Sequence, residues 1–323
     1  MDRIWNLKKQ GDLNEVKHLS AALNVNMVIA RLLVQRGIKT FNEARAFFRP
    51  RLSDLHDPFL MRDMDKAVER LETAIANQEK VIVYGDYDVD GTTSVAMMYS
   101  FLFSRLEHLE YYIPDRYSEG YGISPKSINY AVENGFTLVI ALDCGIKAVE
   151  KIAGAKSRGL DFIICDHHNP DEQIPPAAAV LDPKRNDCDY PYKELSGCGV
   201  GFKFLQAYCQ KNNIEQDEIY DLLDMVAVSI ASDIVPITGE NRVLAYYGLK
   251  KLNFNPGIGL QTIINLAGIG DTEITISDIV FKIGPRLNAS GRIEHGKKSV
   301  QILVSQDEEK SDIIGEEIDS FNE

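Results

Sequence analysis

Four short runs of apolar residues dominate the central part of the chain: VIVYG, TLVIAL, DFIIC and AAAVL, at 81–85, 137–142, 161–165 and 177–181. Continuous apolar runs are typical of strands that are buried on both faces of a sheet. Segments with apolar residues at helical spacing lie between them, including 92–106 and 147–159. The pattern predicts an α/β fold, in which an open, mostly parallel sheet is flanked by helices.

Both flanking regions are predicted to be helical. Apolar residues recur at helical spacing in 13–23 and 26–37. We interpret 1–60 as a helical extension that packs on the rest. A DNA-binding helix-turn-helix stays open as an alternative, although its base-reading side chains cannot be identified.

After the helical extension, we expect two further parts of the chain: a catalytic core at 61–236 and a helical segment at 237–323. The last helical pattern reaches Glu323 without a glycine or proline stop signal. We therefore expect it to be the start of a linker helix leading to a second domain outside this chain.

Composition narrows the possible environments and partners. The chain has 323 residues, 45% of them hydrophobic, and a formal net charge of -13. It has no apolar run near the roughly 18 residues of a membrane span and no signal-peptide pattern, so we expect a cytoplasmic protein. The acidic balance argues against a broadly basic DNA-binding surface, so a polyanion would bind locally, through bound cations. The five cysteines form no CxxC pair and are expected to be reduced and mostly buried.

Each apolar run leads directly into an aspartate, at Asp86, Asp143, Asp166 and Asp182. Parallel strands deliver such residues to one rim of the sheet, where ligands bind in open α/β folds. For Asp182, which precedes a proline, we favour a local turn or helix cap. The other three predict a shared site.

The hexapeptide DYDVDG at 86–91 adds two further carboxylates, Asp88 and Asp90. Three neighbouring carboxylates repel one another unless protons or a cation neutralise them, which predicts a metal site. Gly91 is expected to permit a tight turn before a helix that Thr92 or Thr93 caps.

Two adjacent histidines, His167 and His168, follow Asp166 directly. Because consecutive side chains point in different directions, one histidine can bind a metal while the other faces the substrate. Oxygen-rich sites with one or two imidazoles suit Mn²⁺ or Mg²⁺. Asp233 ends another helical stretch, but spacing alone does not identify it as a ligand.

The segment IGPRLNASGRI at 283–293 is predicted to be irregular and combines arginines with small residues. Arginine forks bind phosphate in a bidentate manner, but solvated surface arginines fit the pattern equally well. The candidate phosphate-binding residues are Arg286, Asn288, Ser290 and Arg292.

The order of GDYDVDG, LDCG, CDHHNP and ASDIVP resembles the four motifs of the DHH phosphoesterase superfamily. Within it, YSEGYGIS at 117–124, the segment 180–203 and IGPRLNASGRI are similar to RecJ-like single-stranded-DNA exonucleases, over about 53–323. No motif position is substituted.

The resemblance implies a role for each candidate residue. Asp86, Asp88, Asp90, Asp143, His167 and Asp233 would hold two divalent cations, with Mn²⁺ favoured over Mg²⁺. His168 would lie near the scissile phosphate with Asp166 supporting the histidines, and the 283–293 segment would bind substrate phosphate. We expect His168 and Arg286 or Arg292 to stabilise negative charge during two-metal phosphodiester hydrolysis.

The resemblance also implies a function and its partners. The expected function is 5′ to 3′ exonuclease action on single-stranded DNA in repair and recombination, with a helicase and a single-strand-binding protein as candidate partners. Two alternatives stay open: a DHH enzyme acting on oligoribonucleotides, cyclic dinucleotides or pyrophosphate, and a non-catalytic replication scaffold with the same fold.

Overall fold

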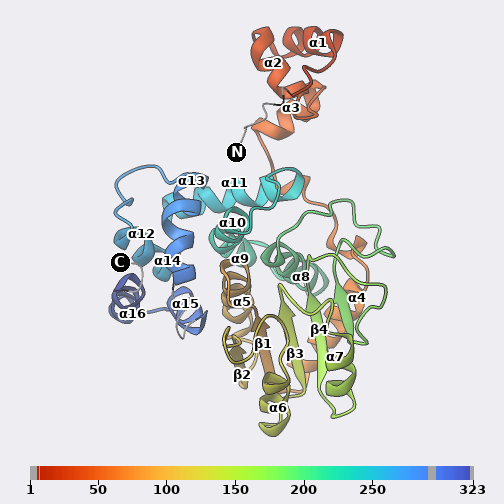
Figure 1. The fold of residues 1–323 in the computed structure, drawn as a ribbon, viewed down its shortest axis with the longest axis vertical. Helices are drawn as coiled ribbons and strands as arrows, with labels where there is room; N and C mark the ends of the chain where they lie inside the picture. The colour runs from red at the N-terminus through yellow and green to blue at the C-terminus, as the bar shows by residue number, and fades with distance from the viewer. Residues whose placement is uncertain (1–5, 7, 290–295, 321–323) are drawn as a thin grey trace. The chain divides into compact units, whose positions relative to one another are not determined.

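The chain folds into two compact units, Met1–Leu55 and His56–Glu323, in the computed structural model (Figure 1). The structure describes residues 6, 8–289 and 296–320. None of the helices in those ranges is both long and apolar enough to cross a membrane.

The first unit contains α1 (Leu13–Leu23), α2 (Met27–Val34), α3 (Phe41–Phe48) and the 3₁₀ turn η1 (Leu52–Asp54). Asp12 caps α1, since its carboxylate accepts from the backbone N–H groups of Asn14 and Glu15. The helices enclose a small apolar core that includes Val16, Leu19 and Leu33. The predicted helices of this region are confirmed, whereas the boundaries at 60 and 236 stay a prediction.

The second unit is built around a parallel sheet whose five described strands have the order β2-β1-β3-β4-β5. The strands are β1 (Val81–Gly85), β2 (Leu109–Tyr112), β3 (Leu138–Leu142), β4 (Asp161–Cys165) and β5 (Ala179–Leu181). The four predicted strands and the parallel α/β sheet are confirmed. β2 was not predicted because it is a partly exposed edge strand, LEYY, with a charged residue inside it.

Helices cover both faces of this sheet (Figure 1). Alternate strand residues such as Ile82, Tyr84 and Ile164 share a core with α6 (Pro125–Glu133) and α7 (Val149–Lys156). The helices α4 (Met64–Ala76), α5 (Val89–Leu102) and α8 (Gly197–Lys211) also contact the strands. The chain leaves β1 for β2 on one side, and β3 lies on the other. This reversal of strand order places a ligand crevice at the carboxyl ends of β1 and β3.

The rest of the second unit is helical, apart from loops. It comprises η2 (Pro58–Leu60), α9 (Asp217–Tyr220), α10 (Leu223–Ser232), α11 (Gly239–Phe254), α12 (Ile258–Leu266), α13 (Ile276–Asp278), the π-helix η3 (Ile279–Ile283), α14 (Gly284–Ala289), α15 (Gly296–Leu303) and α16 (Glu308–Ser320). The prediction of an irregular 283–293 segment is wrong for 284–289, which form α14. Pro285 lies within an uninterrupted helical run over 276–289, directly after the π-helical turn of η3.

A buried ion pair ties the start of the second unit to its helices. Nζ of Lys203 lies 3.1 Å from Glu240 and donates to the carbonyl of His56 over 2.6 Å. Glu240 also accepts from the His56 N–H at 3.0 Å and from the Tyr190 hydroxyl at 2.7 Å. Both charged side chains are almost fully buried, at 0% and 1% exposure. The pair therefore joins α8, α11 and the segment before α4.

We expect Lys203→Ala to lower the free energy of unfolding by about 3–5 kcal/mol, because it leaves the Glu240 carboxylate buried without its cation. Urea denaturation of the purified protein measures this. Lys211→Ala, in the same helix, removes a half-exposed lysine that pairs with Glu72 at 3.2 Å, and it should cost less than about 1 kcal/mol. Equal losses in both variants would contradict the role assigned to the buried pair.

Candidate metal centre

The carboxyl ends of β1, β3 and β4 bring the predicted aspartates to one edge of the sheet. Asp86, Asp143 and Asp166 each follow the last residue of their strand directly, and each is at most 2% exposed. Asp182 follows β5 in the same way, but its carboxylate accepts from the Lys184 N–H at 2.7 Å. The expected local turn at Asp182 is therefore confirmed.

The DYDVDG run forms the turn from β1 into α5. Asp88 caps α5, with its carboxylate accepting from the Gly91 N–H at 2.9 Å. The expected cap at Thr92 or Thr93 is wrong, because the helix begins earlier and both hydroxyls donate to backbone carbonyls inside it. A Cβ at Gly91 would lie 2.4 Å from the carbonyl oxygen of Asp86. Only glycine lets α5 approach the end of β1 so closely.

Asp90 lies at the junction of three helices. Its Oδ2 accepts from the Gly197 N–H at 2.7 Å, and its Oδ1 accepts from the Cys198 N–H at 2.9 Å and the Ser229 hydroxyl at 2.7 Å. Oδ2 also lies 3.7 Å from Nε2 of His167. Asp90 thus anchors α5 to α8 and α10 while keeping one oxygen beside the candidate metal ligands.

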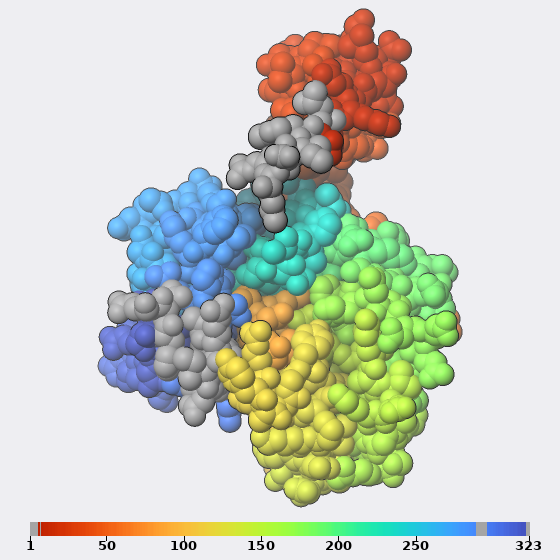
Figure 2. Space-filling view, in the orientation of Figure 1, coloured from red at the N-terminus to blue at the C-terminus, as the bar shows by residue number. Residues whose placement is uncertain are grey.

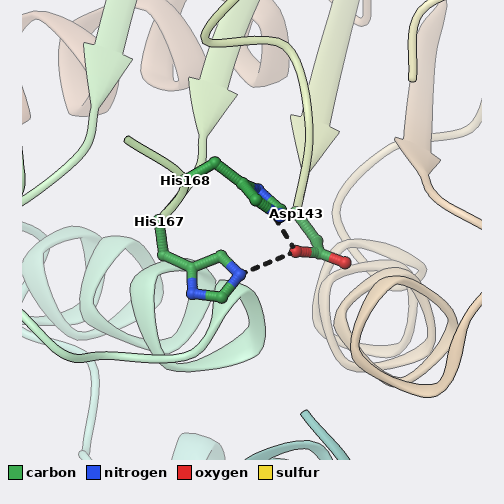
Figure 3. A group of neighbouring side chains, drawn as sticks. All are labelled: Asp143, His167 and His168. Carbon is green, nitrogen blue, oxygen red and sulfur yellow. Dashed lines mark hydrogen bonds and ion pairs between the residues drawn. The ribbon is translucent and has the colours of Figure 1, made fainter. Parts of the chain in front are cut away.

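Asp143 occupies a constrained turn after β3. Its φ of 58° lies in the left-handed region, which non-glycine residues seldom adopt. Its Oδ1 lies 3.0 Å from Nε2 of His167 and 4.0 Å from Nδ1 of His168 (Figure 3). A Cβ at Gly197 would come within 2.6 Å of the Asp143 Cβ, so the start of α8 presses directly on this turn. The strained backbone therefore presents the carboxylate to both imidazoles.

Asp166 organises the loop that carries the two histidines. Its Oδ1 accepts from the N–H groups of His167 at 2.7 Å and His168 at 3.1 Å, and lies 2.7 Å from Nδ1 of His168. Its Oδ2 accepts from the Ile146 N–H at 2.9 Å. Burial alone would raise the pKa of Asp166, but these hydrogen bonds and the charge of His168 hold it below its ordinary value.

Two overlapping groups of side chains can each hold a cation. One combines Asp143, His167 and His168, and the other combines Asp90, His167 and Asp233, with the candidate ligand atoms of each group within 4.8 Å of one another. Oδ2 of Asp233, at the carboxyl end of α10, lies 3.7 Å from Nε2 of His167. This oxygen-rich set with imidazole fits Mn²⁺ or Mg²⁺.

Unsatisfied polar atoms at this edge are consistent with a metal. Oδ1 of Asp86 and Nδ1 of His167 are buried and have no hydrogen-bond partner among the described residues. Burial, followed by the charge of Asp88, raises the pKa of Asp86 to about 7. Burial, followed by the charge of Asp90, raises the pKa of Asp233 to about 7 and that of Asp143 well above its ordinary range. A cation would relieve both the burial cost and the mutual repulsion.

The sequence profile described as "DHH family, N-terminal domain" matches residues 80–230, which hold most of these side chains. Residues 80–230 form a domain of the DHH family. Among curated proteins of this family, the single-stranded-DNA-specific exonuclease RecJ of Bacillus subtilis is 39% identical over 318 residues, which are 98% of this chain and 40% of that protein. RecJ of Escherichia coli is 30% identical over 328 residues, covering 98% of this chain and 56% of that protein. This chain thus spans about half the length of these relatives.

Solved structures support the DHH fold. The crystal structure of Thermus thermophilus RecJ in complex with Mn²⁺ superposes with a TM-score of 0.82 at 25% identity, over 96% of this chain and 44% of that one. An exonuclease RecJ bound to manganese gives a TM-score of 0.76 at 27% identity, over 84% and 67% of the two chains. The RecJ-like resemblance and the predicted fold class are confirmed.

The DHH site gathers some predicted residues but not others. Arg286 lies in α14, where it donates to Asp319 at 3.0 Å and to the Lys282 carbonyl at 3.0 Å. Its hydrogen bonds thus join α14 to α16 and to η3. Asn288 is half-buried in α14, and Ser290 and Arg292 lie outside the described residues. Phosphate binding by this segment stays a prediction.

The sequence interpretation missed two features of the site. The hydroxyl of Tyr121 lies 3.3 Å from Nε2 of His168 and 3.3 Å from the carbonyl oxygen of Asp143. The backbone at Gly197 and Cys198, together with Ser229, holds Asp90. The YSEGYGIS motif pointed to Tyr121 without giving it a role, while the Asp90 partners are over 100 residues away in sequence and carry no spacing signal.

We expect the metal-free protein to lose stability between pH 5.5 and pH 8. Asp86 and Asp233 each have a pKa of about 7 in the folded protein, compared with about 3.9 for an unperturbed aspartate. Above about pH 3.9, such a carboxyl therefore binds more protons in the folded state than in the unfolded state. The free energy of unfolding therefore falls as the pH rises from that value through the folded pKa. The lowered pKa of Asp166 acts in the opposite direction below its ordinary value, and the lowered pKa of His167 does so below about 6.5, whereas the raised pKa of His168 adds to the loss of stability above about 6.5. Melting temperatures in EDTA at the two pH values measure the change.

Asp143→Asn should raise the melting temperature in EDTA at pH 8 and flatten the pH dependence, because it removes a buried charge. Asp161→Asn, at the opposite end of β4, changes a carboxylate that is 40% exposed and should leave the pH dependence unaltered. Addition of Mn²⁺ should raise the melting temperature of the wild-type protein more at pH 8 than at pH 5.5, since metal binding requires deprotonated ligands. A pH-independent melting temperature in EDTA would contradict the electrostatic argument.

Proposed function

We propose that this chain is the catalytic part of a divalent-metal-dependent phosphodiesterase that degrades single-stranded DNA from the 5′ end, in repair and recombination. The observation that carries the proposal is the cluster of buried carboxylates and two histidines at the carboxyl edge of the sheet, in a chain similar to RecJ along 98% of its length. Polarity and the exclusion of duplex DNA rest on that similarity alone.

In the proposed mechanism, His167 would help to hold both cations because it belongs to both groups of candidate ligands, and Asp143, whose Oδ1 lies 3.0 Å from it, would help to hold one of them. Asp86 and Asp88 approach from the β1 edge, and Asp233 from α10. When bound, divalent cations supply Lewis acidity, which activates water and neutralises charge on a phosphoryl group. Relatives solved with Mn²⁺ and with Mg²⁺ support a divalent ion, and we favour Mn²⁺.

The two histidines are suited to different tasks. Burial lowers the pKa of His167, which favours the neutral imidazole that a metal requires. The hydrogen bond to Asp166 raises the pKa of His168, whose side chain is 43% exposed. A protonated His168 beside the cations can donate to a phosphate oxygen and stabilise its developing negative charge. Asp166 then acts as a positioning residue for both imidazoles.

Protein partners and location extend the proposal beyond the site. A helicase and a single-strand-binding protein as partners, and a cytoplasmic location, stay predictions from the family resemblance. Binding of substrate phosphate by Arg286, Asn288, Ser290 and Arg292 also stays a prediction.

We expect Asp143→Asn to reduce Mn²⁺-dependent release of nucleotides from end-labelled single-stranded DNA by at least about 10²-fold, since even outer-shell partners of metal ligands contribute 10–100-fold. Asp161→Asn is the matched control and should retain wild-type activity. Excess EDTA should abolish release by the wild-type protein. Undiminished activity of Asp143→Asn, or activity that persists in EDTA, would disprove the metal site.

The choice of substrate separates the proposal from its alternatives. We expect digestion of a long 5′-phosphorylated single strand, little digestion of the matching duplex, and release that begins at the 5′ label. Exclusive hydrolysis of dinucleotides would favour a DHH enzyme for small substrates. Metal-independent DNA binding without hydrolysis would favour the scaffold hypothesis.

A further inference from the structure

The two units of the chain have opposite net charges. Residues 1–55 contain ten lysines and arginines against five aspartates and glutamates, which gives a formal net charge of +5. Residues 56–323 contain 25 against 43, which gives a net charge of -18. Figure 2 draws the described part of the first unit in red to orange-red. A polyanion is attracted to the first unit, whereas the second repels it wherever no cation is bound. The proposed metal chemistry makes no use of the basic unit.

One side of α3 combines exposed aromatic and cationic side chains. Phe41, Arg45 and Phe48 occupy positions i, i+4 and i+7 of the helix, which lie on the same side of it. The two rings are 52% and 54% exposed. Arg49 follows one turn after Arg45, and both arginines are exposed. Neither takes part in the ion pairs that the described residues of this unit form. We call these four residues the α3 face.

The α3 face stands on a rigid support. Thr40 and Glu43 form a capping box at the start of the helix, in which the Glu43 N–H donates to the Thr40 hydroxyl at 3.2 Å and the Glu43 carboxylate accepts from the Thr40 N–H at 3.0 Å. Ala44 is buried, and Phe47 packs on the apolar core of the unit. The Phe48 ring is edge-on to the Phe47 ring, with centroids 5.1 Å apart. The fixed helix therefore presents its rings before a ligand arrives, which reduces the ordering cost of binding.

The chemistry of the α3 face favours single-stranded nucleic acid over duplex. Bases of a single strand stack on aromatic rings whatever their sequence, while cationic side chains contact the backbone. Phe41 and Phe48 are about 10 Å apart along the helix axis, given a rise of about 1.5 Å per residue, and Arg45 lies between them. Two bases of one strand can therefore each take a ring. A duplex keeps its bases stacked inside and would offer only its phosphates to the arginines.

The neighbouring helix α2 provides a comparison within the same unit. Its exposed side chains are Val28, Ile29 and Leu32. These have no hydrogen-bonding groups, whereas reading base edges in a duplex groove requires donors and acceptors. The helix-turn-helix alternative therefore gains no support from α2. Within this unit, α3 has the side chains better suited to contact DNA.

We propose that the α3 face is an accessory binding site for single-stranded DNA, in which bases stack on Phe41 and Phe48 while Arg45 and Arg49 neutralise phosphates. The inference takes its ligand from the proposed function, on which it rests, and adds a site that requires no metal. Because the α3 face lies in a different unit from the metal centre, it binds DNA in EDTA as well.

Fluorescence anisotropy of a labelled oligothymidylate, titrated with the full chain in EDTA, tests the site. We expect Phe41→Ala with Phe48→Ala to weaken binding by roughly 25-fold or more, which is about fivefold for each ring and corresponds to the lower end of base–aromatic stacking at about 1 kcal/mol. Phe41→Tyr with Phe48→Tyr keeps both rings and should stay within about twofold of wild type. Phe254→Ala is the matched control, since Phe254 ends α11 in the second unit and is 93% exposed.

The two arginines carry a separate expectation. Arg45→Gln with Arg49→Gln removes two phosphate contacts, so the slope of log affinity against log salt should become shallower by about 1.4, at about 0.7 for each contact with a single strand. The two phenylalanine substitutions to alanine should leave this slope unaltered. Arg158→Gln is the matched control, because Arg158 is an exposed arginine of the second unit that donates to Asn129.

Three results would overturn the proposal. Wild-type affinity in the double alanine variant would exclude stacking. Full affinity in Phe41→Leu with Phe48→Leu, together with a loss in the alanine variant, would make the α3 face an apolar docking surface for a protein partner. Equal affinity for the single strand and the matching duplex would reduce the site to a phosphate contact. Because the substituted side chains are exposed, unchanged melting temperatures should show that every variant folds.

Failure of the accessory site is distinguishable from failure of the proposed function. If the wild-type protein hydrolyses DNA in Mn²⁺ while the double alanine variant changes neither KM nor affinity in EDTA, the accessory site is wrong and the phosphodiesterase proposal stands. If the wild-type protein hydrolyses no phosphodiester but binds the single strand through the α3 face, the accessory site stands and the phosphodiesterase proposal is wrong.

Discussion

Electrostatic repulsion among buried carboxylates is the constraint on which the rest of this structure depends. Asp86, Asp90, Asp143 and Asp166 are each at most 2% exposed at one edge of the sheet. Burial penalises every ionised carboxylate, and each charge penalises its neighbours. Hydrogen bonds from backbone N–H groups offset part of this cost: Asp90 accepts one from the start of α8, and Asp166 accepts one from the turn after β3. For Asp86 and Asp143 burial and neighbouring charges outweigh such contacts, since the pKa of both carboxyls is raised, and that imbalance is what a bound cation would relieve.

The same imbalance links stability to function. A metal binds these carboxylates in their deprotonated form, whereas burial and mutual repulsion favour the protonated form in the metal-free protein. The candidate ligands therefore lower the stability of the metal-free fold that positions them. The left-handed backbone at Asp143 and the contact of Gly197 with its Cβ add a local steric constraint. Substitutions that relieve the repulsion should therefore stabilise the metal-free protein but abolish metal-dependent activity, which is the usual trade-off between stability and activity at active sites.

The sequence predicted the features that depend on local pattern. Four strands were identifiable because their apolar runs are uninterrupted, and the strand-end aspartates followed from the geometry of parallel sheets. β2 was missed because its exposed Glu110 breaks the pattern, and α14 because proline and glycine in its first turn suggested a loop. The structural role of Asp90 was not accessible from sequence, since Gly197, Cys198 and Ser229 meet it only in the folded chain. Arg286 was a phosphate candidate from its chemistry alone, whereas the fold gives it Asp319 as an ion-pair partner.

The adjacent histidines explain how one loop can serve both metal and substrate. His168 has Nδ1 at 2.7 Å from Asp166 and Nε2 at 3.3 Å from the Tyr121 hydroxyl. To act as a metal ligand through Nδ1, it would have to give up the Asp166 hydrogen bond that raises its pKa. The His167 ring makes no hydrogen bond to Asp166: its Nε2 lies 3.0 Å from Oδ1 of Asp143, itself a candidate ligand, and its Nδ1 is unpaired among the described residues. The electrostatics therefore favour His167 as the ligand and His168 as the group that meets the phosphate, with Asp166 enforcing the division.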